Sequence, residues 1–305
     1  RLVGSTLRAC GLSETTTYCF ADPADLERLG ITEAGRGVPV KVINPLVADQ
    51  SEMRRSLLPG LVRSVAYNLD HNVALFELGR VFFGHERRSQ PDEPMYVAGV
   101  LAGRRADDAW NLRYDEYDFF DAKGVVERLL ESLRVAKVRF RAADPQTYPW
   151  LQPGRSAEVL AGGELLGWVG NVHPASLARM GVERDVVAFE LSVAALLRLA
   201  HDELPYRDVP TFPGVTHDLA IVVDESVTYE MLLQRIGSAG GKLLADVRLF
   251  DVYRDAERVG EGKKSMAFSL TYRAADRTLT SEEVEKAHER LVKKVCKATG
   301  GEVRS

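Results

Sequence analysis

The sequence contains little cysteine, no long apolar run and no excess of charge of one sign. Its 305 residues include three cysteines, Cys10, Cys19 and Cys296, none of them in a C-x-x-C pair. So sparse a set argues against a disulfide framework or a zinc knuckle and indicates a reducing compartment, so we expect a cytoplasmic protein. No apolar run approaches the ~18 residues of a membrane span, and no membrane partner is expected.

The charge balance and the first residue also limit the function. The net charge is −4, and neither the part up to residue 209 nor the remainder is strongly basic. A nucleic acid would therefore bind through a local site and not through a broad basic surface. The chain begins at Arg1 without a signal-like segment, which predicts that it is a piece of a longer protein.

The motifs of self-contained enzymes are absent from the sequence. It has no G-x-S-x-G, H-E-x-x-H or G-x-x-x-x-G-K-[ST] motif, and its six histidines are scattered without the spacing of metal ligands. We therefore expect no catalytic residue, no metal ligand and no cofactor bound by this chain. Glu77 and Arg80 lie three apart on one predicted strand, so they face opposite sides. Glu77 is predicted to be a buried structural acid paired with an arginine such as Arg63 or Arg155.

A proline-rich segment divides the chain. LPYRDVPTFPG, residues 204–214, holds three prolines and a glycine and predicts a boundary between domains of residues 1–205 and 206–305. The periodicity of the first domain predicts helices over 57–69 and 118–133 and strands over 73–83, 95–101, 156–160, 165–169 and 187–191. This order favours the α+β class, with a mostly antiparallel sheet flanked by helices.

The second domain has the element order β-α-β-β-α-β. Its predicted strands cover 217–223, 243–253, 265–273 and 302–304. Thr228 is predicted to cap the first helix, which runs to Ile236, and Thr280 opens a T-S-E-E capping box at the second. This order is that of a ferredoxin-like unit, which places both helices on one face of its sheet.

The other face of this sheet is predicted to be open. Strand alternation turns Ser265 and Ala220 outward and points a second set of side chains toward the helices, namely Met266, Phe268, Leu270 and Tyr272. In the middle segment we predict that Phe250 and Val252 face inward, which turns Asp251 and Tyr253 outward and leaves Val247 and Leu249 on the outer face. Ala220, Asp251, Tyr253 and Ser265 then converge on one exposed patch.

The predicted patch has the chemistry of a base-binding site. A tyrosine ring offers a stacking platform, a carboxylate accepts hydrogen bonds from a guanine edge, and an alanine permits close approach of a flat ring. Lys263 and Lys264, with Arg254 and Arg258 in the preceding loop, are candidates for phosphate contacts. The alternative interpretation is a strand-end tyrosine beside a solvated hairpin.

Several long motifs resemble one protein family. NPLVADQSEMRRSLLPGLVRSVAYN (44–68), LFELGRVF (75–82) and LQPGRSAEV (151–159) are similar to the catalytic-like core of the β subunit of bacterial phenylalanyl-tRNA synthetase. VPTFPGVTHDLAIVV and LFDVYRDAERVGEGKKSMAFSLTYR resemble the ferredoxin-fold anticodon-binding domain of the same subunit. The resemblance covers nearly the whole chain, with the motifs in the family's order.

The resemblance implies a class II synthetase-like but catalytically inactive core over 1–205, which packs on the α subunit, and an anticodon-binding domain over 206–305. It implies an (αβ)₂ heterotetramer that joins phenylalanine to its tRNA and uses ATP and Mg²⁺. LFELGR has no arginine two residues before its glutamate, and GRSAEV is not glycine-rich. A working class II site needs both features, so the sequence agrees with an inactive core.

The family's anticodon residues correspond to Ala220, Asp251, Tyr253, Lys263, Lys264 and Ser265 in this chain. His217 stands where the family usually has an arginine, which puts a phosphate or salt-bridge role at that position in doubt. Two other functions stay open. One is a stand-alone ferredoxin-like regulatory module that binds a partner or ligand without RNA specificity, and the other is an independent ATP-using ligase, against which the absence of phosphate-binding motifs weighs.

Overall fold

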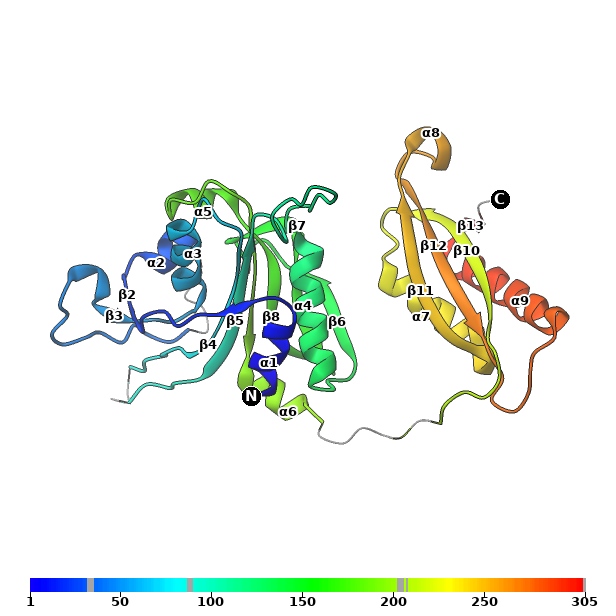
Figure 1. The fold of residues 1–305 in the computed structure, drawn as a ribbon, viewed down its shortest axis with the longest axis horizontal. Helices are drawn as coiled ribbons and strands as arrows, with labels where there is room; N and C mark the ends of the chain where they lie inside the picture. The colour runs from blue at the N-terminus through cyan, green and yellow to red at the C-terminus, as the bar shows by residue number, and fades with distance from the viewer. Residues whose placement is uncertain (32–35, 87–89, 202–205, 207, 304–305) are drawn as a thin grey trace. The chain divides into compact units, whose positions relative to one another are not determined.

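The computed structural model describes residues 1–31, 36–86, 90–201, 206 and 208–303. The chain divides into two compact units, Arg1–Pro205 and Tyr206–Ser305 (Figure 1). Within the predicted boundary segment 204–214, residues 204, 205 and 207 lie outside the described residues. In the described part of the chain, no helix combines the length and hydropathy that a transmembrane span requires.

The first unit is built on a seven-stranded sheet with the order β1-β4-β5-β9-β8-β7-β6. The strands are β1 (Ser13–Glu14), β4 (Val73–Arg80), β5 (Met95–Ala102), β6 (Val138–Ala142), β7 (Leu151–Ala161), β8 (Glu164–Val172) and β9 (Val186–Ser192). β1 runs parallel to β4, and the other neighbouring strands pair antiparallel. A separate short ladder joins β2 (Phe20–Ala21) to β3 (Glu52–Met53), with the 3₁₀ turn η1 (Ala48–Gln50) between them.

Helices cover both faces of this sheet (Figure 1). α2 (Asp25–Leu29), α3 (Leu58–Tyr67) and α5 (Pro174–Arg179) bury apolar side chains in one core. α1 (Leu2–Ala9), α4 (Phe119–Ser132) and α6 (Val193–Leu199) contribute to a second core on the other face. Because both faces are covered, a polar side chain on a central strand must find its partner inside the protein.

The predicted elements of this unit are present, with shifted ends. The helix predicted over 57–69 is α3, and the strand predicted over 73–83 ends at Arg80. The helix predicted over 118–133 is α4, which begins after a capping box in which the Asp118 side chain accepts from the backbone N–H groups of Phe120 and Asp121. α1, α2, α6 and β6 were not predicted, because these elements are short.

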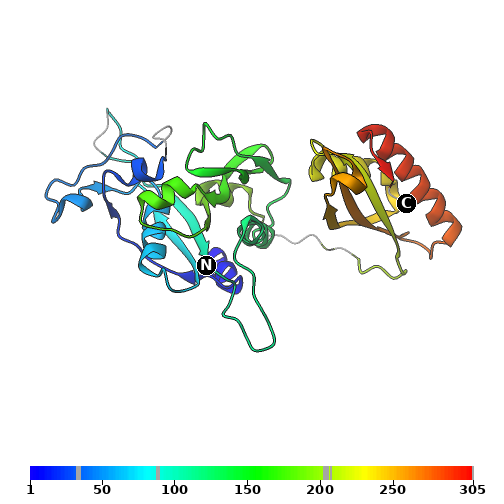
Figure 2. The same ribbon diagram turned by 90° about the horizontal axis from the view of Figure 1, so that it is seen from above.

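The second unit is a ferredoxin-like sandwich. Its sheet has the order β11-β12-β10-β13 and is formed by β10 (Val215–Asp224), β11 (Leu244–Tyr253), β12 (Lys263–Tyr272) and β13 (Glu302–Val303). The helices are α7 (Tyr229–Gly240), the short α8 (Ala256–Val259) and α9 (Ser281–Thr299), and η2 (Gly241–Leu243) follows α7. Figure 2 shows α9 lying along one side of this sheet.

The core of the second unit lies between the sheet and the helices α7 and α9. Phe268, Leu270 and Tyr272 of β12 are fully buried there, together with Leu232 of α7 and Leu291 of α9. Thr228 caps α7, as predicted, and Thr280 and Glu283 form the predicted capping box of α9. α7 continues to Gly240, past the predicted end at Ile236, and residue 304 of the predicted last strand lies outside the described residues.

The predicted fold class is confirmed. The chain is α+β, with a large, mostly antiparallel sheet flanked by helices and followed by a ferredoxin-fold domain.

Candidate nucleic-acid interface

Three rows of side chains cross the helix-free face of the β10–β12–β11 sheet. Directly opposed residues of antiparallel strands share a face, so the register defines each row. The first row joins Tyr253, Ser265 and Val222, and the second joins Asp251, Ala267 and Ala220. The third joins Arg248, Ser269 and Asp218. The predicted alternation of β10 and β12 therefore holds, and it brings Ala220, Asp251, Tyr253 and Ser265 to neighbouring positions.

The prediction for β11 was wrong in part, because this strand contains a bulge. Leu249 opposes Phe268 and Asp251 opposes Ala267, so Phe250 is an extra residue without an opposed partner. Val247 and Leu249 pack against the core instead of lying on the outer face. Phe250, predicted inward, is 52% exposed, and Val252 is 38% exposed at the edge of the sheet.

Asp251 and Tyr253 still point away from the core, because the inserted residue shifts the alternation before them. The Asp251 side chain is exposed, and Tyr253 is half-buried outside the hydrophobic cluster. A bulge of this kind re-aims neighbouring side chains and is frequent beside functional sites.

A short helix holds the Tyr253 ring in place. The Tyr253 hydroxyl donates to Asp255 Oδ2 at 2.7 Å. Asp255 also caps α8, since its Oδ1 accepts from the backbone N–H groups of Glu257 at 3.0 Å and Arg258 at 3.2 Å. This stretch was predicted to be a loop, although Asp followed by A-E-R is a recognisable N-cap signal. The phenol is thus tied to a capped turn, which limits the freedom of its ring.

Glu225 neutralises two of the four basic side chains near the patch. The Arg254 guanidinium donates to both carboxylate oxygens, at 2.8 and 3.2 Å. Lys264 Nζ donates to the Glu225 backbone carbonyl oxygen at 2.9 Å and lies 3.6 Å from Oε1. The hydrogen bond from Arg254 keeps the pKa of the Glu225 carboxyl below its usual range. Glu225 therefore engages both cations, although the Arg254 side chain remains 57% exposed.

The two lysines predicted to contact phosphate differ in their surroundings. Lys263 is exposed and shares the helix-free face with Ser265 by strand parity. Lys264 opposes Val223 on the helix side and is only 7% exposed. Ser265 lies on the helix-free face but is 4% exposed, so it is a floor of the predicted patch and not an exposed member. The strand begins two residues earlier than predicted, which places Lys264 inside the sheet.

His217 lies on the opposite side of the sheet from the candidate interface. It opposes Leu270, and its ring centroid is 5.1 Å from that of His288. The Tyr272 hydroxyl lies 3.1 Å from His288 Nδ1. Burial, followed by the neighbouring His217, lowers the pKa of His288, and burial raises that of Tyr272 to about 12. These contacts give His217 a packing role within the domain.

In the first unit, Glu77 is a buried structural acid, as predicted, but its partner is Arg54. Arg54 Nη1 donates to Glu77 Oε1 at 2.6 Å, and the Thr17 hydroxyl donates to Oε2 at 2.7 Å. Arg63, one of the predicted partners, instead forms two 2.6 Å hydrogen bonds with Asp25. The pairing of Glu77 joins segments far apart in the sequence, so spacing alone could not reveal it.

The charged side chains around one hollow of the first unit are paired with one another. A hollow of about 620 Å³ is lined by Asp22, Asp25, Arg54 and Arg63 among others. The two aspartates are paired with Arg63 and Arg28, and Arg54 is paired with Glu77. Among the described residues, no three His, Cys, Asp or Glu side chains are grouped so that they could hold a metal ion.

Comparison with known proteins decides the family. Residues 1–193 match the model of the phenylalanyl tRNA synthetase beta chain CLM domain, and residues 210–304 match the ferredoxin-fold anticodon binding domain. The chain belongs to the phenylalanine–tRNA ligase beta subunit family. It is 41% identical to the phenylalanine–tRNA ligase beta subunit of Symbiobacterium thermophilum, over 98% of this chain and 33% of that protein. The corresponding subunit of Syntrophotalea carbinolica is 38% identical over 97% of this chain and 37% of its own length.

The family assignment confirms the resemblance seen in the motifs. The chain spans little more than a third of the length of the curated relatives that it matches. A solved pyrrolysyl tRNA synthetase from Desulfitobacterium hafniense is 14% identical, covers 67% of this chain and 72% of its own, and gives a TM-score of 0.48.

Proposed function

We propose that this chain is the part of a phenylalanine–tRNA ligase β subunit that binds the anticodon of phenylalanine tRNA and packs against the α subunit. The observation that carries the proposal is the position of two side chains at the end of β11. There Asp251 and the Tyr253 ring lie on the helix-free face of the second unit. The sequence of this unit matches the ferredoxin-fold anticodon binding domain family. In this proposal the first anticodon base stacks on Tyr253, and the Asp251 carboxylate accepts hydrogen bonds from its edge.

The surrounding residues support this arrangement. Ala220 and Ala267 form a flat floor beside Asp251 because neither side chain extends far from the sheet. Lys263 is the exposed lysine available to the phosphate, whereas we assign Lys264 the role of bracing Glu225. Asp255 and α8 fix the tyrosine before RNA arrives, which lowers the entropic cost of binding.

The proposed contact with the α subunit agrees with exposed apolar side chains in the first unit. Ile43 is 93% exposed and Leu46 95% exposed, on the segment that leads to η1. Exposed apolar side chains grouped in this way are typical of protein interfaces. Joint expression of this chain with an α subunit should therefore yield a complex, and Leu46→Asp should weaken the association relative to Lys41→Asp, a matched change at an exposed polar position nearby.

The remaining parts of the proposal concern the whole enzyme. An (αβ)₂ heterotetramer in the cytoplasm would join phenylalanine to its tRNA with ATP and Mg²⁺, and the α subunit would supply the chemistry. This chain would contribute binding and scaffolding. Pyrophosphate exchange that depends on phenylalanine should accordingly be absent from the isolated chain.

The test of anticodon binding compares two RNAs. Filter binding of the chain to phenylalanine tRNA and to the same tRNA with an exchanged anticodon should give the tighter complex with the native anticodon. Equal affinity for both RNAs would remove the anticodon assignment and favour a regulatory module that lacks RNA specificity.

A further inference from the structure

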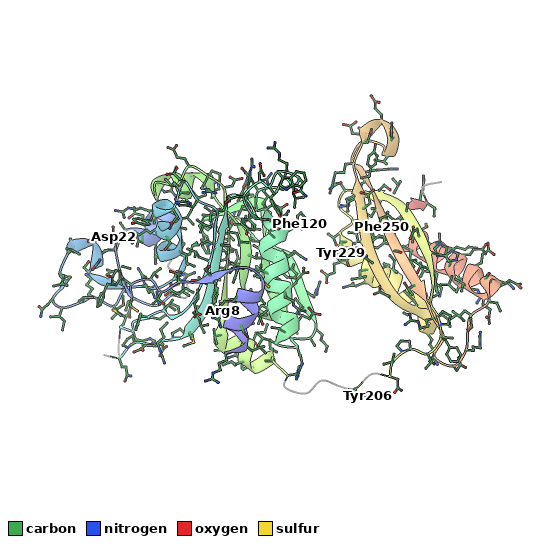
Figure 3. The ribbon with its side chains drawn as sticks, viewed as in Figure 1. Arg8, Asp22, Phe120, Tyr206, Tyr229 and Phe250 are labelled. Carbon is green, nitrogen blue, oxygen red and sulfur yellow. The ribbon has the colours of Figure 1, made fainter. Side chains whose placement is uncertain are left out.

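The β11 bulge turns one aromatic side chain, Phe250, onto the helix-free face of the sheet. The sequence pattern predicted that this side chain would face the core. Phe250, which is labelled in Figure 3, has no opposed residue on β12 and is 52% exposed. An exposed phenylalanine ring loses part of the favourable free energy that burial would give it. Leu249, its neighbour, packs against the core in its place.

Phe250 lines a shallow hollow together with charged and polar side chains. The hollow has a volume of about 290 Å³, and its other lining residues are Asp218, Arg248 and Ser269. These three form one row across β10, β12 and β11. Asp218 and Arg248 are exposed, and neither forms an ion pair or side-chain hydrogen bond with another described residue. The row therefore presents a donor, an acceptor and a hydroxyl beside an aromatic ring.

This hollow continues the face that carries Tyr253. The Arg248 row lies two rows from the Tyr253 row, which corresponds to about 13–14 Å along the strand at ~3.3 Å per residue. Phe250 stands beside the intermediate row of Asp251, Ala267 and Ala220. Four-stranded sheets with exposed aromatics on one face bind successive unstacked bases of single-stranded RNA. Both aromatic side chains lie on the same strand, so a loop that crosses it can meet one after the other.

We propose that Phe250, Arg248, Asp218 and Ser269 form a second nucleotide subsite, which binds the nucleotide next to the one at Tyr253. Phe250 supplies the stacking surface, Arg248 contacts a phosphate or an acceptor on the base, and Asp218 and Ser269 contact the base edge. The subsite rests on the proposed function, because it assumes that a single-stranded RNA loop occupies this face. An apolar ring without a hydrogen-bonding group makes the stacking tolerant of base identity, so this subsite adds affinity more than sequence preference.

The test is a double-mutant cycle between the 305-residue chain and anticodon stem–loop RNAs. The RNAs are the intact loop, a loop abasic at the first anticodon position, and two loops abasic at the nucleotides on either side of it. The protein variants are Phe250→Leu, Phe250→Trp and Tyr253→Leu. Val252→Ala is the matched control, since Val252 lies on the same strand and opposes core residue Met266.

Phe250→Leu should weaken binding of the intact loop by roughly 5- to 150-fold, the loss of one stacked base. That loss should disappear with one of the two flanking abasic loops but persist with the loop abasic at the first anticodon position. Phe250→Trp should retain binding, and Val252→Ala should change it little. Circular dichroism of each variant shows that the sheet is intact.

The outcomes separate the subsite from the proposed function. If Tyr253→Leu couples to the first anticodon base but Phe250→Leu couples to neither flanking base, the second subsite is overturned and anticodon binding stands. If Phe250→Leu weakens binding of an α subunit and leaves RNA binding unchanged, the hollow is a protein contact and the proposal is likewise overturned. If no variant affects RNA binding, both the subsite and the proposed function fail.

Discussion

Glu77 and Asp251 are both acidic residues on β-strands, but the two units use them differently. Glu77 lies on β4, an inner strand of a sheet that is covered on both faces, and both its carboxylate oxygens are bonded, to Arg54 and Thr17. Asp251 lies on an edge strand of a sheet with one helix-free face and is exposed. Among the described residues it has no ion-pair or hydrogen-bond partner for its side chain. The layer architecture around a strand decides whether such a carboxylate is structural or available to a ligand.

The largest expected effect comes from breaking the buried pair in the first unit. Arg54→Ala leaves the Glu77 carboxylate buried without its cation, which should lower the free energy of unfolding by about 3–5 kcal/mol. Glu14→Gln, in an exposed pair with Arg8, should cost at most about 1 kcal/mol. Trp110, Trp150 and Trp168 all lie in the first unit, so denaturation followed by tryptophan fluorescence reports on that unit alone. Equal losses for the two variants would contradict the structural role of Glu77.

A smaller effect distinguishes the two lysines at the start of β12. Lys263→Ala should weaken RNA binding and reduce the slope of log affinity against log salt by about 0.7, the value for one phosphate of a single strand. Lys264→Met should leave both quantities unchanged, because the Lys264 ammonium already binds Glu225. Binding isotherms at several salt concentrations provide the measurement. A salt slope reduced equally by Lys264→Met would show that the buried lysine is released to the RNA.

The smallest predicted effect concerns the helix side of the second unit. The folded-state pKa of His288 is lowered by burial and by His217, so the unfolded chain binds more protons below about pH 6.5, the ordinary histidine value. The contribution of His288 to stability is therefore complete above that pH and is lost as the pH falls through the lower folded-state pKa. Hydrogen exchange of β12 and α9 amides should show less protection at pH 5.5 than at pH 7.5, and His288→Asn should reduce this difference. His71→Asn, in the other unit, is the control, and an unchanged pH dependence in His288→Asn would contradict the assignment.

The sequence predicted most of the second unit because its strands alternate regularly. β10 and β12 have an unbroken period of two, so their inward and outward residues were assigned correctly. β11 failed at Leu249 and Phe250, where two adjacent apolar residues interrupt the alternation. Such a pair signals a bulge, but the sequence does not specify which member turns outward, because either choice leaves apolar residues on both faces. Only the pairing with β12 settles it.

Other features depended on contacts that lie far apart in the sequence. Arg54 and Glu77 lie 23 residues apart with α3 between them, and the burial of Lys264 and Ser265 follows from the point where β12 begins. The presence of Asp251 and Tyr253 on one face was predicted on an incorrect assignment of their neighbours. Val247 and Leu249 face the core, so strict alternation would have turned Asp251 and Tyr253 toward the core as well. The extra residue at the bulge shifts the alternation by one and turns both side chains outward.

The central claim is that Tyr253 and Asp251 together bind the first anticodon base. The most direct measurement is the ratio of dissociation constants for stem–loops with guanine and with another base at that position, compared between the wild-type chain, Tyr253→Ala, Asp251→Asn and the Val252→Ala control. We predict that wild type and Val252→Ala prefer guanine and that Asp251→Asn loses much of this preference, because the carboxylate accepts hydrogen bonds from the guanine edge. Tyr253→Ala should weaken binding of both loops by roughly 1–3 kcal/mol, because a stacked ring tolerates either base. A ratio left unchanged by Asp251→Asn, or dissociation constants left unchanged by Tyr253→Ala, would contradict the account.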